Sequence, residues 1–246
     1  MLIKTKTIKG YKLHSLDGEI GKVKEFFFDD HYWTIRYLVA ETGNWLTGQQ
    51  VLISPHALGD ANKEEQFVEV DLTKKQIENS PPLNSDTPVS RQYEEAYYGY
   101  YGWSKYWSGP NMWGAYHYID INTSQLPKVK WGPKKPDAHL RSTHDVKGHS
   151  IKAKDGEIGH VDDFIIDDKT WEIQYMVINT TIWWPGKKVL VSPHWIESIS
   201  WDKSEVLVDV LLEVIKRAPE YTDEMLLTDG YETEIYNHYK SEGMNR

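Results

Sequence analysis

Some side chains that could act as acids or bind cations occur as adjacent pairs. Asp29-Asp30 and Asp167-Asp168 each place two carboxylates together, as calcium binding or proton transfer could require. Neighbouring residues of a strand point to opposite faces, and neither pair lies in an Asp-x-Asp-x-Asp-Gly calcium loop. We therefore interpret both pairs as turns.

The histidines and serines also lack the spacing that chemistry needs. His56 and His194 each follow a Ser-Pro pair, and one histidine at each place does not make a metal site. Ser54 and Ser192 lack the Gly-x-Ser-x-Gly elbow, and no phosphate-binding glycine loop occurs. The chain has no cysteine, which excludes thiolate chemistry. We predict no catalytic residue, no metal, no cofactor and no enzymatic activity.

A long internal repeat organises these residues. Asp17-Gly18-Glu19-Ile20-Gly21 returns 138 residues later as Asp155-Gly156-Glu157-Ile158-Gly159, and the same shift superimposes the following positions without a gap. A period this long indicates two copies of one domain, because solenoid periods run only about 20 to 50 residues. We predict copy one at residues 1–101, an ordered linker at 102–139, and copy two at 140–246.

Each copy contains patterns typical of short strands. Asp17-Gly18 predicts a hairpin turn between a strand near Ile8 to Ser15 and a return strand from Ile20 to Phe28. The stretch Trp33 to Val39 alternates, which predicts a core face and a solvent face that carries Thr34 and Arg36. Five or six such strands with tight turns indicate a small all-β barrel or sandwich.

Two helices should follow the strands in each copy. In copy one, Thr73 and Gln76 form a capping-box pattern before a short helix that ends near Asn79. A second helix is expected from Ser90 to Tyr101, and its counterpart from Asp229 to about Ser241. In the first, tyrosines at helical spacing form one face, which we interpret as a packing surface: Tyr93, Tyr97, Tyr98 and Tyr101.

The segment between the copies is unusually aromatic. The chain holds 11 Trp and 16 Tyr but 5 Phe, and many of them lie between residues 103 and 140. Because Trp and Tyr anchor interfaces, we predict a contact surface here, with these candidate residues: Trp103, Trp107, Trp113, Trp131, Tyr98 and Tyr101. We expect Trp103, Trp107 and Trp113 to be largely buried, within the chain or by a partner.

The bulk composition limits the function classes further. A formal net charge of −9 argues against general nucleic-acid binding. The first residues are polar rather than signal-like, and no stretch approaches the roughly 18 apolar residues of a membrane span. We expect a soluble, cytoplasmic protein without a membrane span.

Together, the pieces Asp-Gly-Glu-Ile-Gly-x-Val, Asp-Asp, Trp-x-Ile-x-Tyr-x-Val and Val-Leu-x-Ser-Pro resemble the PRC-barrel family. That family is named after the cytoplasmic part of the H polypeptide of the photosynthetic reaction centre, and it includes the C-terminal domain of a ribosome maturation factor. The resemblance covers about Lys6 to Leu72 and His144 to Val210. It implies a mainly β fold of two small antiparallel β-barrels, each followed by short helices, in a tandem protein of bacterial type.

The resemblance also implies an interaction module without catalysis. Our leading hypothesis is therefore a protein-interaction or assembly module, and we expect a protein partner or self-association. One alternative is a small-ligand binder with an aromatic-lined cleft between the barrels. Another is a ribosome- or RNA-associated factor, in which Lys128 to Lys135 would contact phosphates while Trp131 stacks on a base.

Overall fold

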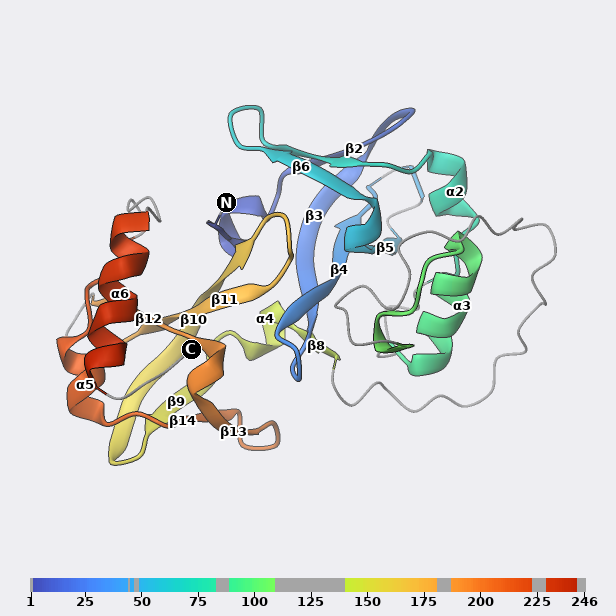
Figure 1. The fold of residues 1–246 in the computed structure, drawn as a ribbon. Helices are drawn as coiled ribbons and strands as arrows, with labels where there is room; N and C mark the ends of the chain where they lie inside the picture. The colour runs from blue at the N-terminus through green and yellow to red at the C-terminus, as the bar shows by residue number, and fades with distance from the viewer. Residues whose placement is uncertain are drawn as a thin grey trace. The chain divides into compact units, whose positions relative to one another are not determined.

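The computed structural model describes residues 2–43, 45–46, 49–82, 89–108, 140–180, 187–222 and 229–242. The chain divides into two compact units, each mainly β (Figure 1). The first-copy unit is Lys9–Leu140, and the second-copy unit is Met1–Ile8 together with Arg141–Arg246. The predicted boundaries follow the repeat in the sequence, whereas the compact units group the first eight residues with the second copy.

The first-copy unit is built on one strongly bent sheet. Its strands follow the order β5-β4-β3-β2-β7-β6, and β8 pairs with β3 off this path. All the pairs along this path are antiparallel except β2 with β7, which is parallel and differs from the antiparallel arrangement expected. The bounds are β2 (Lys12–Ser15), β3 (Gly18–Asp29), β4 (Thr34–Glu41), β5 (Gln50–Ile53), β6 (Leu58–Asn62), β7 (Phe67–Val70) and β8 (Leu140–Ser142).

The second-copy unit repeats this arrangement with the order β12-β11-β10-β9-β14-β13, and β1 pairs with β10. Ile35 faces Phe28 in one sheet and Ile173 faces Ile166 in the other, which is the same register after the 138-residue shift. The predicted duplication is therefore confirmed at the level of strand register. The bounds are β1 (Leu2–Lys4), β9 (Ser150–Ala153), β10 (Gly156–Asp167), β11 (Ile173–Asn179), β12 (Lys188–Val191), β13 (Ile196–Ser200) and β14 (Glu205–Val208).

The helices follow the strands as predicted. Thr73 and Gln76 form the expected capping box, in which each side chain accepts a hydrogen bond from the other residue's backbone N–H. Ser90 caps the helix that carries the tyrosines. The helices are α1 (Thr5–Ile8), α2 (Lys74–Glu78), α3 (Arg91–Tyr101), α4 (Thr143–Val146), α5 (Leu212–Arg217) and α6 (Asp229–Ser241), with short 3-10 turns η1 (Pro55–Ala57), η2 (Tyr106–Ser108) and η4 (Pro193–Trp195).

The repeated aspartate of the Asp-Gly-Glu-Ile-Gly motif joins its hairpin to the following helix. The Oδ1 atom of Asp17 accepts a hydrogen bond from the backbone N–H of Lys74 at 2.8 Å, and Asp155 accepts one from Leu212 at 2.7 Å. The bond from Lys74 holds the pKa of Asp17 below its ordinary value. The motif therefore fixes the hairpin to the start of α2 in copy one and of α5 in copy two, which is a structural role.

The second glycine of the motif is required by a close backbone approach. Gly21 has φ +132°, and a Cβ atom added there would lie 2.1 Å from the carbonyl oxygen of Glu41. At Gly159 the corresponding distance to the oxygen of Asn179 is 2.0 Å. A side chain at either position would push β3 from β4, or β10 from β11.

Two expectations for the strands are wrong. The stretch from Ile8 to Ser15 is not one strand, because Thr5–Ile8 is helical and β2 begins at Lys12. Thr34 and Arg36 do not face solvent, because each is only 1% exposed. Since β3 and β4 pair Phe28 with Ile35 and then Phe27 with Tyr37, Arg36 is an extra residue in a β-bulge, where simple alternation no longer holds.

Candidate functional site

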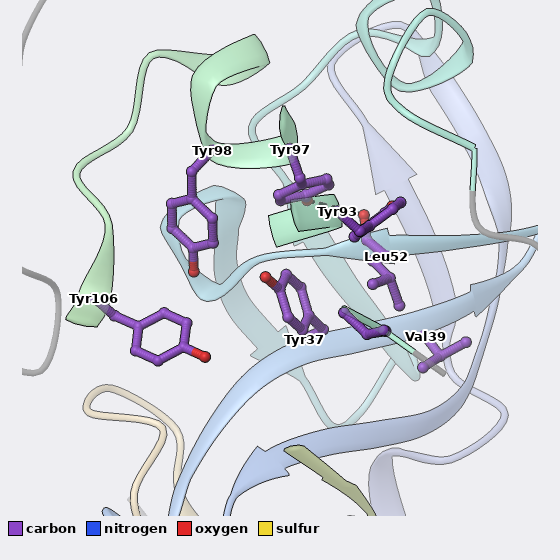
Figure 2. Packing of buried hydrophobic residues seen from close by; sticks show 8 residues of the cluster. Tyr37, Val39, Leu52, Tyr93, Tyr97, Tyr98 and Tyr106 are labelled. Carbon is purple, nitrogen blue, oxygen red and sulfur yellow. Dashed lines mark hydrogen bonds between the residues drawn. The ribbon is translucent and has the colours of Figure 1, made fainter. Parts of the chain in front are cut away.

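The tyrosine face of α3 lies against the sheet of the first-copy unit. Tyr93, Tyr97 and Tyr98 are buried, and Figure 2 shows them gathered above Tyr37. The rings of Tyr37 and Tyr97 meet edge to face, with centroids 5.5 Å apart. The interpretation of this face as a packing surface is confirmed.

Hydroxyl groups fix the helix to β5 and to the chain that precedes it. The hydroxyl of Tyr97 donates to the carbonyl of Leu52 at 2.9 Å and accepts from the backbone N–H of Ser54 at 3.0 Å. The hydroxyl of Tyr93 donates to the carbonyl of Pro81 at 3.0 Å. Burial raises the pKa values of both hydroxyls, and it raises the pKa of Tyr98 to about 12. At neutral pH these phenols are hydrogen-bonded structural groups.

A carboxylate lies buried within this aromatic cluster. The Glu94 side chain is 0% exposed, and its Oε1 atom accepts hydrogen bonds from the hydroxyls of Tyr37 and Tyr106, each at 2.9 Å. Its Oε2 atom lies 3.1 Å from Nη1 of Arg91. Glu94 therefore connects α3 to β4 and to the η2 turn.

The buried guanidinium of Arg36 lies on the other side of Tyr106. Its Cζ atom is 3.9 Å from the centroid of the Tyr106 ring, within the range of a cation–π interaction. Its Nε atom is 3.9 Å from Oδ2 of Asp29, whose Oδ1 atom accepts backbone N–H groups of the turn. We call the five side chains the buried charged network: Asp29, Arg36, Arg91, Glu94 and Tyr106.

The network balances two carboxylates against two guanidinium groups. Such an arrangement immobilises its three buried charges, because each is stable only while its partners stay in place, whereas Arg91 is 37% exposed. Tyr106 is held from both sides, by a hydrogen bond to Glu94 and by its stacking on Arg36. The network therefore fixes the chain after α3 onto the sheet, which is a structural role.

Three of the predicted interface residues are half-buried and pack against the aromatic cluster. Trp103 is half-buried and stacks on Tyr101, with ring centroids 4.3 Å apart and an interplanar angle of 11°. Trp107 is half-buried, and its ring centroid lies 4.1 Å from Cζ of Arg91. We call Tyr101, Trp103 and Trp107 the aromatic rim.

The other predicted interface residues are placed differently. Tyr98 is fully buried beneath the rim, where its ring contacts Trp103 and Trp107. Trp113 and Trp131 lie outside the residues that the structure describes, as does the basic stretch 128–135. The structure thus brings together four of the six candidates, three on the surface and one below them.

The second copy does not repeat the network. Gln174 stands where Arg36 is, and Tyr236, the counterpart of Tyr98, is 38% exposed. The bond to β12 comes from Tyr239, whose hydroxyl donates to Leu190 at 3.0 Å. Leu190 corresponds to Leu52, whereas Tyr239 corresponds to Tyr101, so the anchoring tyrosine of copy two lies one helical turn later.

The sequence patterns did not predict that Arg36 and Glu94 are both buried against Tyr106. The signal available was a difference between the copies, because Arg36 is replaced by Gln174 while both carboxylates, Glu94 and Glu232, are kept. A buried arginine needs a carboxylate, and Asp29 supplies it at 3.9 Å, while Glu94 bonds the hydroxyl of Tyr106, whose ring stacks on Arg36.

The second-copy unit contains a separate cavity of about 430 Å³. Apolar side chains from β10 and α5 line it, with charged ends at its edge: Ile158, Leu212, Ile215, Lys187, Lys216 and Arg217. The ammonium group of Lys187 already donates to the carbonyls of Lys216 and Ala218. The lining is aliphatic rather than aromatic.

Among the residues that the structure describes, no group of three or more His, Asp or Glu side chains is placed to hold a metal ion. In the same part of the chain, no helix is long and apolar enough to cross a membrane. Comparison of the sequence with models of protein families and with curated proteins gives no match.

Proposed function

We propose that this protein is a non-enzymatic interaction or assembly module, and that it binds a protein partner through the aromatic rim. The observation that carries the proposal is the support beneath Trp103 and Trp107. Both rings contact the fully buried ring of Tyr98, and Trp107 also contacts Tyr106, which the buried charged network holds in place. Rigid, half-exposed aromatic rings lose little entropy when a partner covers them, and such residues dominate binding energy at interfaces.

The proposal includes the resemblance to the PRC-barrel family. Support comes from the repeated register of the two sheets and from the structural role of Asp17 and Asp155 within the motif. The hydrogen-bonded path of strands ends at β5 and β6 in one unit and at β12 and β13 in the other. Closure of each sheet into a barrel is therefore part of the proposal. The proposal also states that the protein is a cytoplasmic, bacterial tandem protein and that it works without a cofactor.

The interaction hypothesis receives more specific support than its alternatives. The small-ligand hypothesis depends on an aromatic-lined cleft between the two copies, and the aliphatic cavity within the second-copy unit gives it no support. The nucleic-acid hypothesis depends on residues 128–135, which lie outside the described part of the chain. The rim, in contrast, has measured contacts: Trp103 stacks on Tyr101, and both Trp103 and Trp107 contact Tyr98.

Quantitative affinity capture with full-length variants tests the proposal. Trp103→Ala and Trp107→Ala should each reduce capture of a specific partner by about tenfold or more, because removing a rim anchor costs about 2 kcal/mol of binding energy. Tyr236→Ala is the matched control, because it removes a half-exposed aromatic side chain from the other unit. Circular dichroism should show that all three variants stay folded. Equal capture by the wild type and both tryptophan variants would exclude the rim as the interface.

A further inference from the structure

The first residues of the chain complete the sheet of the second copy rather than that of their own. β1 pairs with β10 in antiparallel register, with Leu2 opposite Asp167, Ile3 opposite Ile166, and Lys4 opposite Ile165. α1 follows directly, and the whole segment belongs to the second-copy unit up to Ile8. The chain joins its own copy only from Lys9 onward.

The exchange is reciprocal in the topology. β8 is the copy-two counterpart of β1 after the 138-residue shift, and it pairs with β3 of the first copy. The two segments share a pattern, since Leu2, Thr5 and Ile8 correspond to Leu140, Thr143 and Val146. Each sheet therefore takes its additional strand from the start of the other copy.

Specific side chains hold residues 2–8 in place. Ile3 is 3% exposed and Ile8 is fully buried. The hydroxyl of Thr5 donates to Oδ1 of Asp163 at 2.5 Å, and the backbone N–H of Lys6 lies 3.2 Å from the same oxygen. Asp163 is itself buried, and it also accepts a hydrogen bond from its own neighbour, Phe164. We call this place on β10 the acceptor slot.

We propose that the acceptor slot also binds residues 2–8 of a second copy of this chain, which produces a strand-exchanged dimer. Residues 2–8 supply all the groups that bond to β10 in the acceptor slot. The same residues of another molecule carry identical groups and can make the same bonds. Exchange of an identical element between molecules is a low-cost route to dimers, because no new interface has to be built. Gly10, two residues beyond the segment, has a φ of +88° that glycine tolerates, and a Cβ atom added there would meet no atom within 4 Å.

The competition between the two arrangements depends on concentration. A segment tethered to its own chain acts at an effective concentration in the millimolar range, so the closed monomer should dominate dilute solutions. Refolding at high protein concentration should allow segments to enter the slots of other molecules. This inference goes beyond the interaction function proposed above, and it involves none of the residues of the aromatic rim.

Disulfide trapping in the full-length chain tests the inference, because the natural sequence has no cysteine. One chain carries Lys4→Cys and the other carries Ile165→Cys, at positions that face each other across the β1–β10 pair. Facing residues in an antiparallel pair have Cα atoms about 4.5 to 5.5 Å apart, which suits a disulfide bond. The two chains are unfolded, mixed at high concentration, refolded together and oxidised. The control replaces Lys4→Cys by Thr7→Cys, at an exposed position of the same segment.

We expect a covalent heterodimer in severalfold higher yield than in the Thr7→Cys control, and the yield should rise with protein concentration. The double variant Lys4→Cys/Ile165→Cys at low concentration should instead form a disulfide within one chain. Failure of that internal disulfide would show that residues 2–8 do not occupy the slot. An internal disulfide without heterodimer above the control would overturn exchange between molecules, whatever the result for the rim.

Discussion

Replacing Glu94 by glutamine is the most direct test of the buried charged network. The substitution Glu94→Gln keeps the shape of the side chain and removes its charge. One amide oxygen can still accept from the hydroxyls of Tyr37 and Tyr106, but the amide NH₂ then faces Nη1 of Arg91, donor against donor.

The expected cost follows from the surroundings of Glu94. Its side chain is 0% exposed, so solvent does not screen the change, whereas Arg91 is 37% exposed and can turn toward water. Breaking a buried ionic arrangement by removing one partner costs about 3–5 kcal/mol. The shape is kept and one partner is solvated, so we expect the lower end, about 3 kcal/mol for the first-copy unit.

Glu232→Gln is the matched control, because Glu232 occupies the same repeat position and is only half-buried. Guanidinium-induced unfolding followed by circular dichroism measures both variants, and each unit has to be fitted as its own transition. The Glu232→Gln variant should lose less than about 1 kcal/mol, as is usual for a partly exposed charge. If the two variants differ by less than about 0.5 kcal/mol, within the usual range for surface changes, Glu94 does not hold the network together.

Two further predictions concern the backbone and the tyrosines. Gly21→Ala should destabilise the first-copy unit by about 4 kcal/mol or more in chemical denaturation, because backbone strain and a steric clash add. Gly10→Ala should show the backbone strain alone, about 1–2 kcal/mol. Similar losses of stability in the two variants would contradict the close approach of Gly21 to Glu41. Burial raises the pKa of Tyr98 to about 12, so above its ordinary value of 10.0 the folded state binds more protons than the unfolded state, and stability should fall as the pH rises from 10 toward 12. Tyr98→Phe should lessen this fall in denaturation experiments across the same pH range, and an unchanged slope would refute the assignment.

Local sequence signals predict the parts of the fold that depend on near neighbours. The Asp-Gly turn, the capping box at Thr73 and the cap at Ser90 all satisfy backbone groups within a few residues, so the local sequence is enough to predict them. The burial of Arg36 could not be predicted in this way. It depends on a one-residue shift in strand pairing, and a period-two pattern carries no information about such a bulge.

The exchange of first strands is hidden from the sequence for a different reason. Residues 2–8 and 140–146 are similar to each other, and β3 and β10 are equivalent, so either segment would fit either sheet on local grounds. Only the complete fold distinguishes the two connections. The same ambiguity lowers the free-energy cost of exchange between molecules. A segment whose sequence fits the sheet of either copy also fits that sheet in another molecule.

The difference between the copies connects the buried network to the proposed interface. Copy two has a similar sheet and a similar terminal helix, but Gln174 replaces Arg36, and the helix is anchored one turn later. The network is therefore not needed to build this fold. What it adds in copy one is the fixed position of Tyr106, next to Trp107 at a centroid distance of 4.8 Å. If the rim binds a partner, Glu94→Gln should weaken that binding without touching any exposed side chain of the rim, while Glu232→Gln leaves it intact.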